Sequence, residues 1–532
     1  MLKSIIGALV ILLAFSSLAQ RMNENVNISF GDLKMESGGD VFIVSTFKVD
    51  DGYIVLKKQP IRGPGGFNYY LEKFNEDLES QNLHDISSQF ELDDFVINGI
   101  IKVKDSYILF STKDFPDVRK EELYGQTFNW DNGKMSSPQM IFSQKYERRR
   151  GGINYEMKTS SDDNLLLLTI HPPYVRGQQE SVTFEVYDDQ LERLYSEENI
   201  TFEEEDKNYV IKETLLGADG KIYLLGSKFT PKDKKLGRET GPTEYEVITI
   251  NDGIQDKTML DFGDKFVDDI SLVFSEDGTL YCGGYYRKTD GIGIDGLFLF
   301  TINNETGEVE NETWDEFTKE FITEGWSDRA VAKAKRKEDR KGTDLGLSNL
   351  EFRSVIKHDD GSISMVGEIF WITTTTRTNS NGTTTTTTTY HYGNLVVSRI
   401  NKDGEFSNHT RLRKHHTYYG GYEYFNLKNE VAVLLMRRRD VLYDFDKETL
   451  TKTQKKEMAG VALVLATIKE NGEVLEEGIM DFRNPDYAGF RKYNKIRNEA
   501  FVLDTEKGVE VLITTYFGKK KFGICRLDFT TK

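Results

Sequence analysis

The segment Asp277-Gly278-Thr279-Leu280-Tyr281-Cys282-Gly283-Gly284-Tyr285-Tyr286 decides the fold of this chain. It places a tight-turn dipeptide directly before a short run of apolar and aromatic residues. Asp-Gly pairs favour the positive φ angles that two-residue hairpin turns need, and the run that follows has the composition of a β-strand. The segment therefore predicts a hairpin whose second strand is buried.

The same pattern recurs about eight times along the chain, at a spacing of about 55–80 residues. The turns are Asp51-Gly52, Lys104-Asp105, Asp162-Asp163, Asp219-Gly220, Asp277-Gly278, Asp360-Gly361, Lys428-Asn429 and Lys507-Gly508. A second turn, rich in Asn, Asp and Gly, follows in most units, as in Asn401–Gly404. Each unit therefore predicts four antiparallel strands, here called A to D, with the first turn between A and B and the second between C and D.

Repeated units of four antiparallel strands resemble the blades of a β-propeller. The resemblance implies an all-β fold, and our count predicts an eight-bladed β-propeller of four-stranded antiparallel blades. Seven blades are the alternative, because the units after Gly361 are longer and less regular. A pair of stacked β-sandwiches is a third option. No WD dipeptide or kelch double glycine recurs, so the resemblance indicates no subfamily.

The two ends of the chain predict how such a ring would close. The last unit ends after its third strand, at Phe522–Phe529, and lacks a fourth. An additional strand, Val26–Met35, precedes the first unit. We therefore expect this N-terminal strand to complete the last blade, which would remove an exposed sheet edge.

The first residues predict export from the cytoplasm. Lys3, the apolar stretch Ile5–Phe15 and the small residues Ser17-Leu18-Ala19 have the order of a secretory signal. We expect residues 1–19 to be removed near Ala19-Gln20, leaving one domain over 20–532 that is secreted, periplasmic or at the cell surface, by a bacterial type of route. No later run is long and apolar enough to span a bilayer.

Composition narrows the classes of partner. The formal charge of −18 argues against binding to nucleic acid. The chain has two cysteines, Cys282 and Cys525, both in apolar strands. They predict buried thiols that act as small hydrophobic residues, and a single disulfide is the less favoured alternative. The oligomeric state is not predicted.

Two insertions interrupt the repeat. Residues 316–349 contain good helix formers and many cations, with Ser327 as a candidate N-cap, and predict a basic helical insertion. Residues 373–389 are rich in threonine around an Asn-Gly turn and predict a long hairpin between strands B and C of the sixth unit. Each could be a contact element or a solvated surface feature.

Basic residues gather after strand B in most units, at the end of the sheets where the B–C loops emerge (the B–C loop face). Arg and Lys beside aromatic residues suit an anionic ligand, such as an acidic protein or an anionic glycan. The competing interpretation is that these cations only keep strand ends soluble. The candidate ligand-binding residues are Arg287, Lys288, Arg437, Arg438, Arg439, Lys519, Lys520 and Lys521.

No sequence motif for catalysis is present, because the chain lacks H-E-x-x-H, G-x-S-x-G, Walker and dinucleotide-binding patterns. We therefore predict no catalytic residue, no metal and no cofactor, and a secreted non-catalytic binding protein. The first alternative is a carbohydrate-active enzyme that uses carboxylates near the starts of strands A. The second is a structural component of envelope or surface assembly. The carboxylates are Asp93, Asp94, Glu156, Asp268, Asp269, Glu351 and Glu423.

Overall fold

The structure is a computed structural model with two compact units, residues 91–415 and residues 1–90 with 416–532. It describes residues 26–31, 34–35, 42–49, 51–60, 67–87, 95–129, 133–146, 154–172, 179–205, 208–228, 232–233, 238–239, 244–251, 253–275, 278–288, 293–341, 346–417, 422–438, 461–481, 501–504, 510–517 and 521–529. The predicted signal segment 1–19 lies outside these residues.

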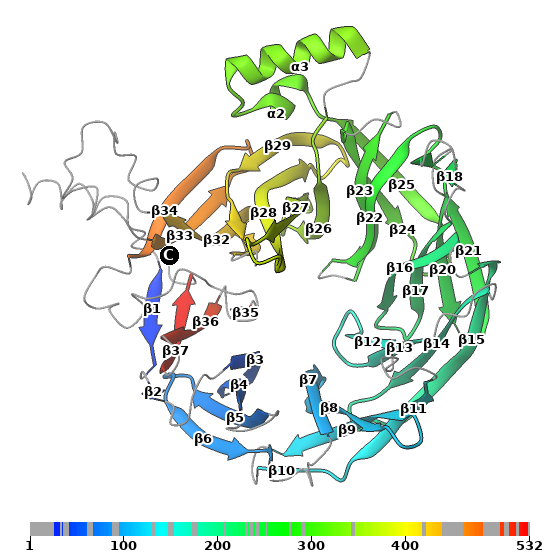
Figure 1. Cartoon of the computed structure of the whole chain (residues 1–532), viewed down its shortest axis with the longest axis vertical. Coiled ribbons are helices and arrows are strands. Elements are labelled where there is room, and N and C mark those ends of the chain that lie inside the picture. The colour runs from blue at the N-terminus through cyan, green and yellow to red at the C-terminus, as the bar shows by residue number, and fades with distance from the viewer. Residues whose placement is uncertain are drawn as a thin grey trace, which may run out of the picture. The chain divides into compact units, whose positions relative to one another are not determined.

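The unit 91–415 contains five antiparallel sheets of four or more strands among its described residues (Figure 1). The first has β7 (Phe95–Val103), β8 (Ser106–Phe115), β9 (Lys120–Asn129), β10 (Lys134–Met135) and β11 (Gln139–Lys145). The second has β12 (Asn154–Thr159), β13 (Leu166–His171), β14 (Gln179–Tyr187) and β15 (Arg193–Glu205). The third has β16 (Tyr209–Leu216), β17 (Ile222–Lys228), β20 (Glu244–Asn251) and β21 (Ile254–Leu260), with the small hairpin β18 (Lys232–Asp233) and β19 (Arg238–Glu239) between β17 and β20 in sequence.

The fourth sheet has β22 (Phe266–Phe274), β23 (Leu280–Arg287), β24 (Gly296–Ile302) and β25 (Val309–Glu316). The fifth has β26 (Leu350–Lys357), β27 (Ile363–Thr378), β28 (Thr384–Ile400) and β29 (Phe406–Leu412). The first strands of consecutive sheets contact one another, from β7 through β12, β16 and β22 to β26. This succession is the packing predicted for consecutive blades.

The other unit contains three such sheets among its described residues. One has β3 (Phe42–Val49), β4 (Gly52–Pro60), β5 (Phe67–Asn75) and β6 (Ser80–Asp85). Another has β31 (Tyr422–Leu427), β32 (Glu430–Arg438), β33 (Val461–Ile468) and β34 (Val474–Asp481), and the short strand β30 (His416–Thr417) precedes it. The third has β35 (Phe501–Asp504), β36 (Glu510–Phe517) and β37 (Lys521–Asp528), joined by β1 (Asn27–Phe30) and β2 (Lys34–Met35).

The N-terminal strand β1 completes the last sheet, as the two chain ends predicted. It runs antiparallel to β37, with Asn27 opposite Asp528 and Phe30 opposite Cys525. The all-β class and the repeated four-stranded antiparallel sheets are thus confirmed. The number of blades and the closure of a ring stay predictions, because the two units are described separately.

The predicted hairpin turns have the backbone that Asp-Gly and its substitutes favour. The φ angle is positive at the first turn in each of the seven units where that turn is described. These residues are Gly52, Lys104, Asp163, Gly220, Gly278, Gly361 and Lys428. The turn at Lys507-Gly508 lies outside the described residues.

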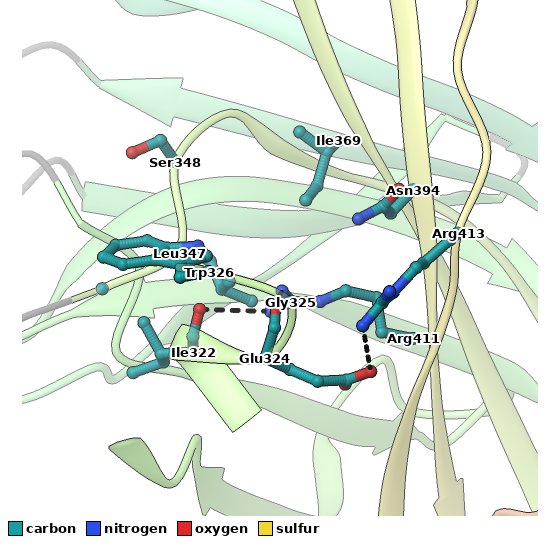
Figure 2. A pocket seen from close by; sticks show the side chains of 11 residues that line it. Ile322, Glu324, Gly325, Trp326, Leu347, Ser348, Ile369, Asn394, Arg411 and Arg413 are labelled. Atoms are coloured by element: carbon teal, nitrogen blue, oxygen red, sulfur yellow. Dashed lines mark hydrogen bonds and ion pairs between the residues drawn. The ribbon is translucent and has the colours of Figure 1, made fainter. Parts of the chain in front are cut away.

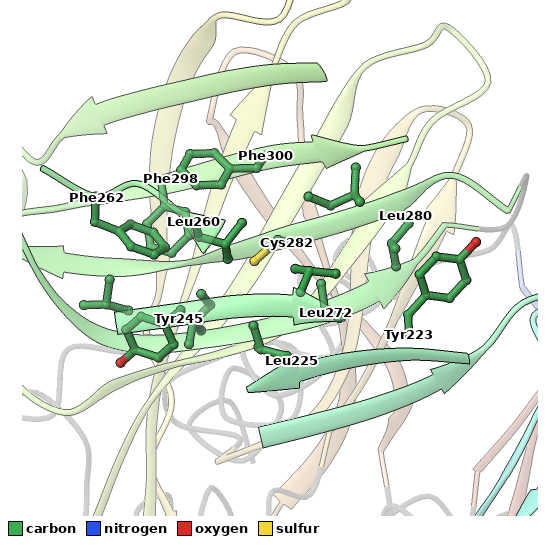
Figure 3. Close-up of a cluster of buried hydrophobic side chains, with 14 of the residues drawn as sticks. Tyr223, Leu225, Tyr245, Leu260, Phe262, Leu272, Leu280, Cys282, Phe298 and Phe300 are labelled. Carbon is green, nitrogen blue, oxygen red and sulfur yellow. The ribbon is translucent and has the colours of Figure 1, made fainter. Parts of the chain in front are cut away.

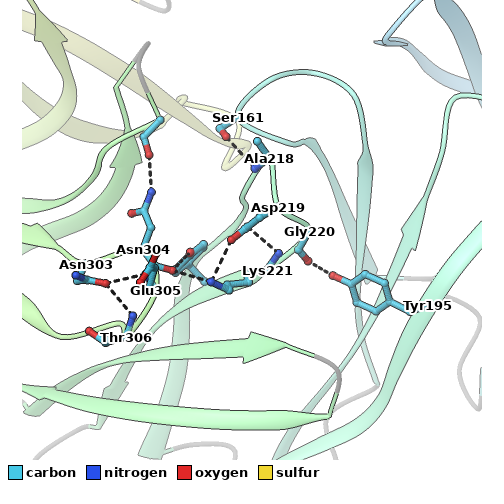
Figure 4. A network of polar contacts seen from close by, with 12 residues as sticks. Ser161, Tyr195, Ala218, Asp219, Gly220, Lys221, Asn303, Asn304, Glu305 and Thr306 are labelled. Carbon is cyan, nitrogen blue, oxygen red and sulfur yellow. Dashed lines mark hydrogen bonds and ion pairs between the residues drawn. The ribbon is translucent and has the colours of Figure 1, made fainter.

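The turns also join neighbouring sheets of the unit 91–415 (Figure 4). The backbone N–H of Ala218 donates to Oγ of Ser161 at 3.1 Å, which links the turns of the third and second sheets. Lys221 Nζ donates to the carbonyl of Asn304 at 3.2 Å, and Asn304 Nδ2 donates to the carbonyl of Gly278 at 2.7 Å. The turns are therefore structural ties, in addition to being strand connections.

Apolar side chains fill the space between adjacent sheets. Figure 3 shows one such cluster, in which Leu225 and Tyr245 of the third sheet pack with Leu272, Cys282 and Phe298 of the fourth. Cys282 and Cys525 are free, buried thiols, as predicted. Burial raises the pKa of each thiol, so both behave as small hydrophobic residues.

The two insertions contain a pair of helices and a long hairpin, respectively. The helices are α2 (Lys319–Thr323) and α3 (Asp328–Lys341), and Figure 1 shows them together beside β29. Oγ of Ser327 accepts from the backbone N–H of Ala330 at 3.3 Å, so Ser327 is the N-cap of α3. β27 and β28 extend into the threonine hairpin, where Thr373 lies opposite Thr389 and Thr378 opposite Thr384. Residues 372–388 are exposed.

Candidate functional site

A cavity of about 380 Å³ lies where the helical insertion meets the fifth sheet of the unit 91–415 (Figure 2). The chain after α2 and the segment before β26 form one side, and β27, β28 and β29 form the other. The position corresponds to the D–A connections before and after that sheet. The lining residues are Ile322, Glu324, Gly325, Trp326, Gly346, Leu347, Ser348, Ile369, Asn394, Arg411 and Arg413.

Arg411 fixes the end of α2 against β29. Its Nη1 donates to the carbonyl of Glu324 at 3.0 Å, and its Nη2 donates to the carbonyl of Phe321 at 2.7 Å. The guanidinium carbon lies 5.0 Å from the centroid of the Phe321 ring. Nε has no hydrogen-bond partner among the described residues. Burial lowers the pKa of Arg411, since carbonyl dipoles compensate a buried charge less than a paired carboxylate would.

Arg413 and Trp326 form the exposed edge of the cavity. The Arg413 side chain is 65% exposed, and its Nη2 lies 3.7 Å from Oε1 of Glu324. An exposed ion pair at this distance contributes about 0–1 kcal/mol, so an incoming anion could replace Glu324 at small cost. Trp326 is 41% exposed and offers an aromatic face on which a ring can pack.

Gly325 brings the loop after α2 close to Arg413. Its φ of 76° is in the left-handed region, which side chains disfavour. A Cβ at this position would lie 2.9 Å from Nη2 of Arg413. The local sequence Glu324-Gly325-Trp326 therefore allows a tight turn at the edge of the cavity.

A buried ionic network supports the β27–β28 side of the cavity. Lys414 and Glu368 form a salt bridge in which both side chains are almost fully buried. Arg353 Nη2 lies 3.0 Å from Oε2 of the same glutamate. The backbone N–H of Lys414 donates to Oδ1 of Asn394 at 3.2 Å. Lys414 is therefore a structural cation, and Asn394 is held in place by its neighbour.

The predicted cations of the fourth sheet have partners in that sheet. Nζ of Lys288 lies 2.5 Å from Oε2 of Glu316 on β25. The guanidinium of Arg287 lies over the ring of Phe266 on β22, 5.7 Å from its centroid. Neither cation is among the residues that line the cavity.

Of the predicted cations in the other unit, the structure describes the side chain of Arg437 alone. Its Nε donates to Oε2 of Glu476 on β34 at 3.2 Å. Arg437 and Arg438 lie within β32 and not after it, because β32 pairs with β33 as far as Val461. The remaining candidates, Arg439, Lys519 and Lys520, lie outside the described residues, as do the side chains of Arg438 and Lys521.

Two further cations near the ends of B strands show the same arrangement. Lys57 Nζ lies 2.6 Å from Oε2 of Glu72 on β5, and Lys228 Nζ lies 3.5 Å from Oε2 of Glu246 on β20. Both glutamates are buried on the third strand of their sheet. These two glutamates were not identified from the sequence.

The carboxylates near the starts of strands A are partly accounted for by structural contacts. Asp269 accepts from the backbone N–H of Phe352 at 2.6 Å and so ties β22 to β26; burial raises its pKa. Glu351 Oε2 lies 3.0 Å from Nη2 of Arg353. Burial raises the pKa of Glu351 and brings that of Glu423 to about 7. The candidates Asp93 and Asp94 lie outside the described residues, as does the side chain of Asp268.

Comparison with known proteins finds similarity in fold alone. No protein-family model and no curated protein matches the chain. The β-propeller domain of the Trilobed protease from Pyrococcus furiosus is 11% identical, with 84% of this chain and 100% of that chain covered and a TM-score of 0.36. The Dos1 propeller is 7% identical, with 95% and 96% covered and a TM-score of 0.42.

Some similar structures belong to larger enzymes. Prolyl oligopeptidase B from Galerina marginata is 9% identical, with 89% of this chain and 55% of that chain covered and a TM-score of 0.38. The chain thus spans about half of that peptidase. These neighbours are propeller-containing structures, and similarity at this level gives no information on activity.

Among the described residues, no helix combines the length and apolar character needed to cross a membrane. Within the same part of the chain, no three His, Cys, Asp or Glu side chains form a group that could hold a metal ion.

Proposed function

We propose that this chain is an extracytoplasmic, non-catalytic binding protein that takes an anionic glycan in the cavity beside α2. The observation that carries the proposal is the presence of Arg411 and Arg413 on one cavity that also has an exposed indole at its edge. Two cations and one carboxylate line it, so the cavity is positive within a chain of formal charge −18.

The cavity suits one acidic sugar unit of such a glycan. Its volume of about 380 Å³ falls within the range of small-molecule pockets. Arg413 can bind a carboxylate or sulfate through two parallel N–H groups, which a lysine could not do. Ile322, Leu347 and Ile369 supply apolar surface, and the face of Trp326 can pack against the ring.

Titration calorimetry with short oligosaccharides tests the proposal. We expect hexuronate oligomers to bind and neutral hexose oligomers of equal length to bind at least about tenfold more weakly, a difference of about 1.4 kcal/mol. Arg413→Gln and Trp326→Ala should each lose binding, whereas Arg377→Gln, an exposed arginine on the threonine hairpin, should not. Equal binding of charged and neutral oligomers, or unchanged binding by Arg413→Gln, would rule out this site.

Further measurements separate binding from the two alternatives. A binding protein leaves its ligand intact, whereas a carbohydrate-active enzyme would release new reducing ends from the bound oligomer during incubation. An assembly component would retain a protein partner in Arg413→Gln and lose it when residues 373–389 are replaced by a short turn. Export is tested separately, by N-terminal sequencing of the expressed mature chain, which we expect to begin at Gln20.

A further inference from the structure

At the base of the threonine hairpin, two histidines face each other over a tryptophan ring. Nδ1 of His391 lies 3.2 Å from Nε2 of His415, and the two ring planes differ by 6°. Trp371 stacks on both, at 4.8 Å from His391 with an interplanar angle of 1° and at 5.4 Å from His415 with an angle of 5°. The imidazoles therefore lie side by side on one aromatic surface.

We propose that His391 and His415 bind one divalent transition-metal ion, of the Cu²⁺, Ni²⁺ or Zn²⁺ class. Imidazole nitrogen is a preferred ligand for these ions. With metal–nitrogen bonds of about 2.0–2.1 Å, a nitrogen separation of 3.2 Å corresponds to an angle of about 100° at the metal. A modest turn of each ring would direct both lone pairs to one point, and water would complete the coordination.

A neighbouring hydroxyl favours the imidazole orientation that a metal requires. Oγ1 of Thr373 lies 2.8 Å from Nε2 of His391. When Nε2–H donates to this hydroxyl, Nδ1 carries the lone pair that faces His415, which is the usual way an outer contact orients a ligating histidine.

When both imidazoles are neutral, the binding step needs no net proton release. Each neutral imidazole carries one proton, which sits on His391 Nε2 and, after a tautomer change, on His415 Nδ1. The nitrogens His391 Nδ1 and His415 Nε2 are then both unprotonated and can each donate an electron pair to the ion. His415 is exposed, so the ion can enter from solvent.

Trp371 provides a local signal for the ion. Bound Cu²⁺ quenches a stacked indole through its open d shell, whereas Zn²⁺ with its filled shell does not. The chain has four tryptophans, so the variant Trp371→Phe assigns the signal. We expect Cu²⁺ to quench part of the fluorescence of the full chain, with prior addition of Zn²⁺ reducing this quenching. The part of the fluorescence that Cu²⁺ quenches should be absent in Trp371→Phe.

Titration of Cu²⁺, Ni²⁺ and Zn²⁺ chloride into the full chain tests the ligands. His391→Gln and His415→Gln should each weaken binding by at least tenfold, and Thr373→Val should weaken it less, as expected for a positioning residue. His84→Gln, a histidine of the other unit, is the matched control and should bind as the parent does. Circular dichroism should confirm that the variants are folded. Unchanged quenching and affinity in both histidine variants would overturn the proposal.

Discussion

Nζ of Lys57 lies 2.6 Å from Oε2 of Glu72, and neither side chain is more than 2% exposed. The pair joins β4 to β5, and Oγ of Ser80 donates to the other carboxylate oxygen at 2.6 Å. A charge so deeply buried is tolerated because its partner and its hydrogen bonds compensate for lost hydration. This lysine, near the end of a B strand, thus holds the sheet together.

Removing the lysine alone should be costly. Lys57→Met leaves Glu72 buried without its cation, and we expect the free energy of unfolding to fall by about 3–5 kcal/mol. The double variant Lys57→Met with Glu72→Leu removes both charges and should recover most of that loss. Urea midpoints of the two variants and the parent check this, and a double variant as unstable as the single one would contradict it.

Glu423 should make stability depend on pH near neutrality. Burial raises its pKa from 4.5 to about 7, so between these values the folded chain binds a proton that the unfolded chain has released. The contribution of this carboxyl to the free energy of unfolding therefore falls as pH rises through that window, by up to roughly 3 kcal/mol.

The variant Glu423→Gln tests this relationship. It should be more stable than the parent at pH 8 and similar to it at pH 4, measured as urea midpoints. Glu470 is an exposed glutamate of the same unit. The variant Glu470→Gln is the control, and its stability relative to the parent should not depend on pH in this way. A difference between Glu423→Gln and the parent that is the same at both pH values would mean that the carboxyl is not the titrating group.

The features that sequence predicted are those set by neighbouring residues. An Asp-Gly turn such as Asp219-Gly220 needs only local backbone angles, and φ at Gly220 is 82°. The strand order of a repeat follows from successive turns, and the pairing of β1 with β37 follows from the missing fourth strand. Ser327 likewise caps α3 by accepting a hydrogen bond from Ala330, which is three residues later in the chain.

The cavity and the histidine pair could not be predicted in this way. Arg411 reaches the carbonyl of Phe321, which is 90 residues earlier in the chain. His391 and His415 are 24 residues apart and meet only after strand pairing. No spacing rule connects such residues, because the distance between them is set by the docking of the insertion and by the register of the hairpin.

Arg411 should be required for α2 more than for the sheet. Arg411→Met leaves the carbonyls of Phe321 and Glu324 without their charged donor, and a hydrogen bond to a charged group contributes about 1.5–3 kcal/mol. We expect amide hydrogen exchange across α2 to accelerate by about 10–100-fold, by the same free-energy difference. Exchange in β22–β24 should not change. Arg413→Gln, which removes an exposed guanidinium from the same cavity, should leave exchange in α2 unaltered.

The closeness of Gly226 to Tyr209 should make a single methyl group destabilising. A Cβ at Gly226 would lie 1.8 Å from the Tyr209 hydroxyl oxygen, which donates to Oε1 of the buried Glu246 at 2.8 Å. Gly226→Ala must therefore displace the tyrosine and weaken that bond, at a cost of about 2–4 kcal/mol.

A double-mutant cycle isolates this contact, because the clash disappears once the phenol is gone. In a Tyr209→Ala background, Gly226→Ala should cost less than about 1 kcal/mol, so the two changes will be strongly non-additive. Gly99→Ala is the matched control, since a Cβ there meets no atom within 4 Å. Urea midpoints of the four members of the cycle give the coupling energy. Additive losses would show that Tyr209 does not lie against this strand.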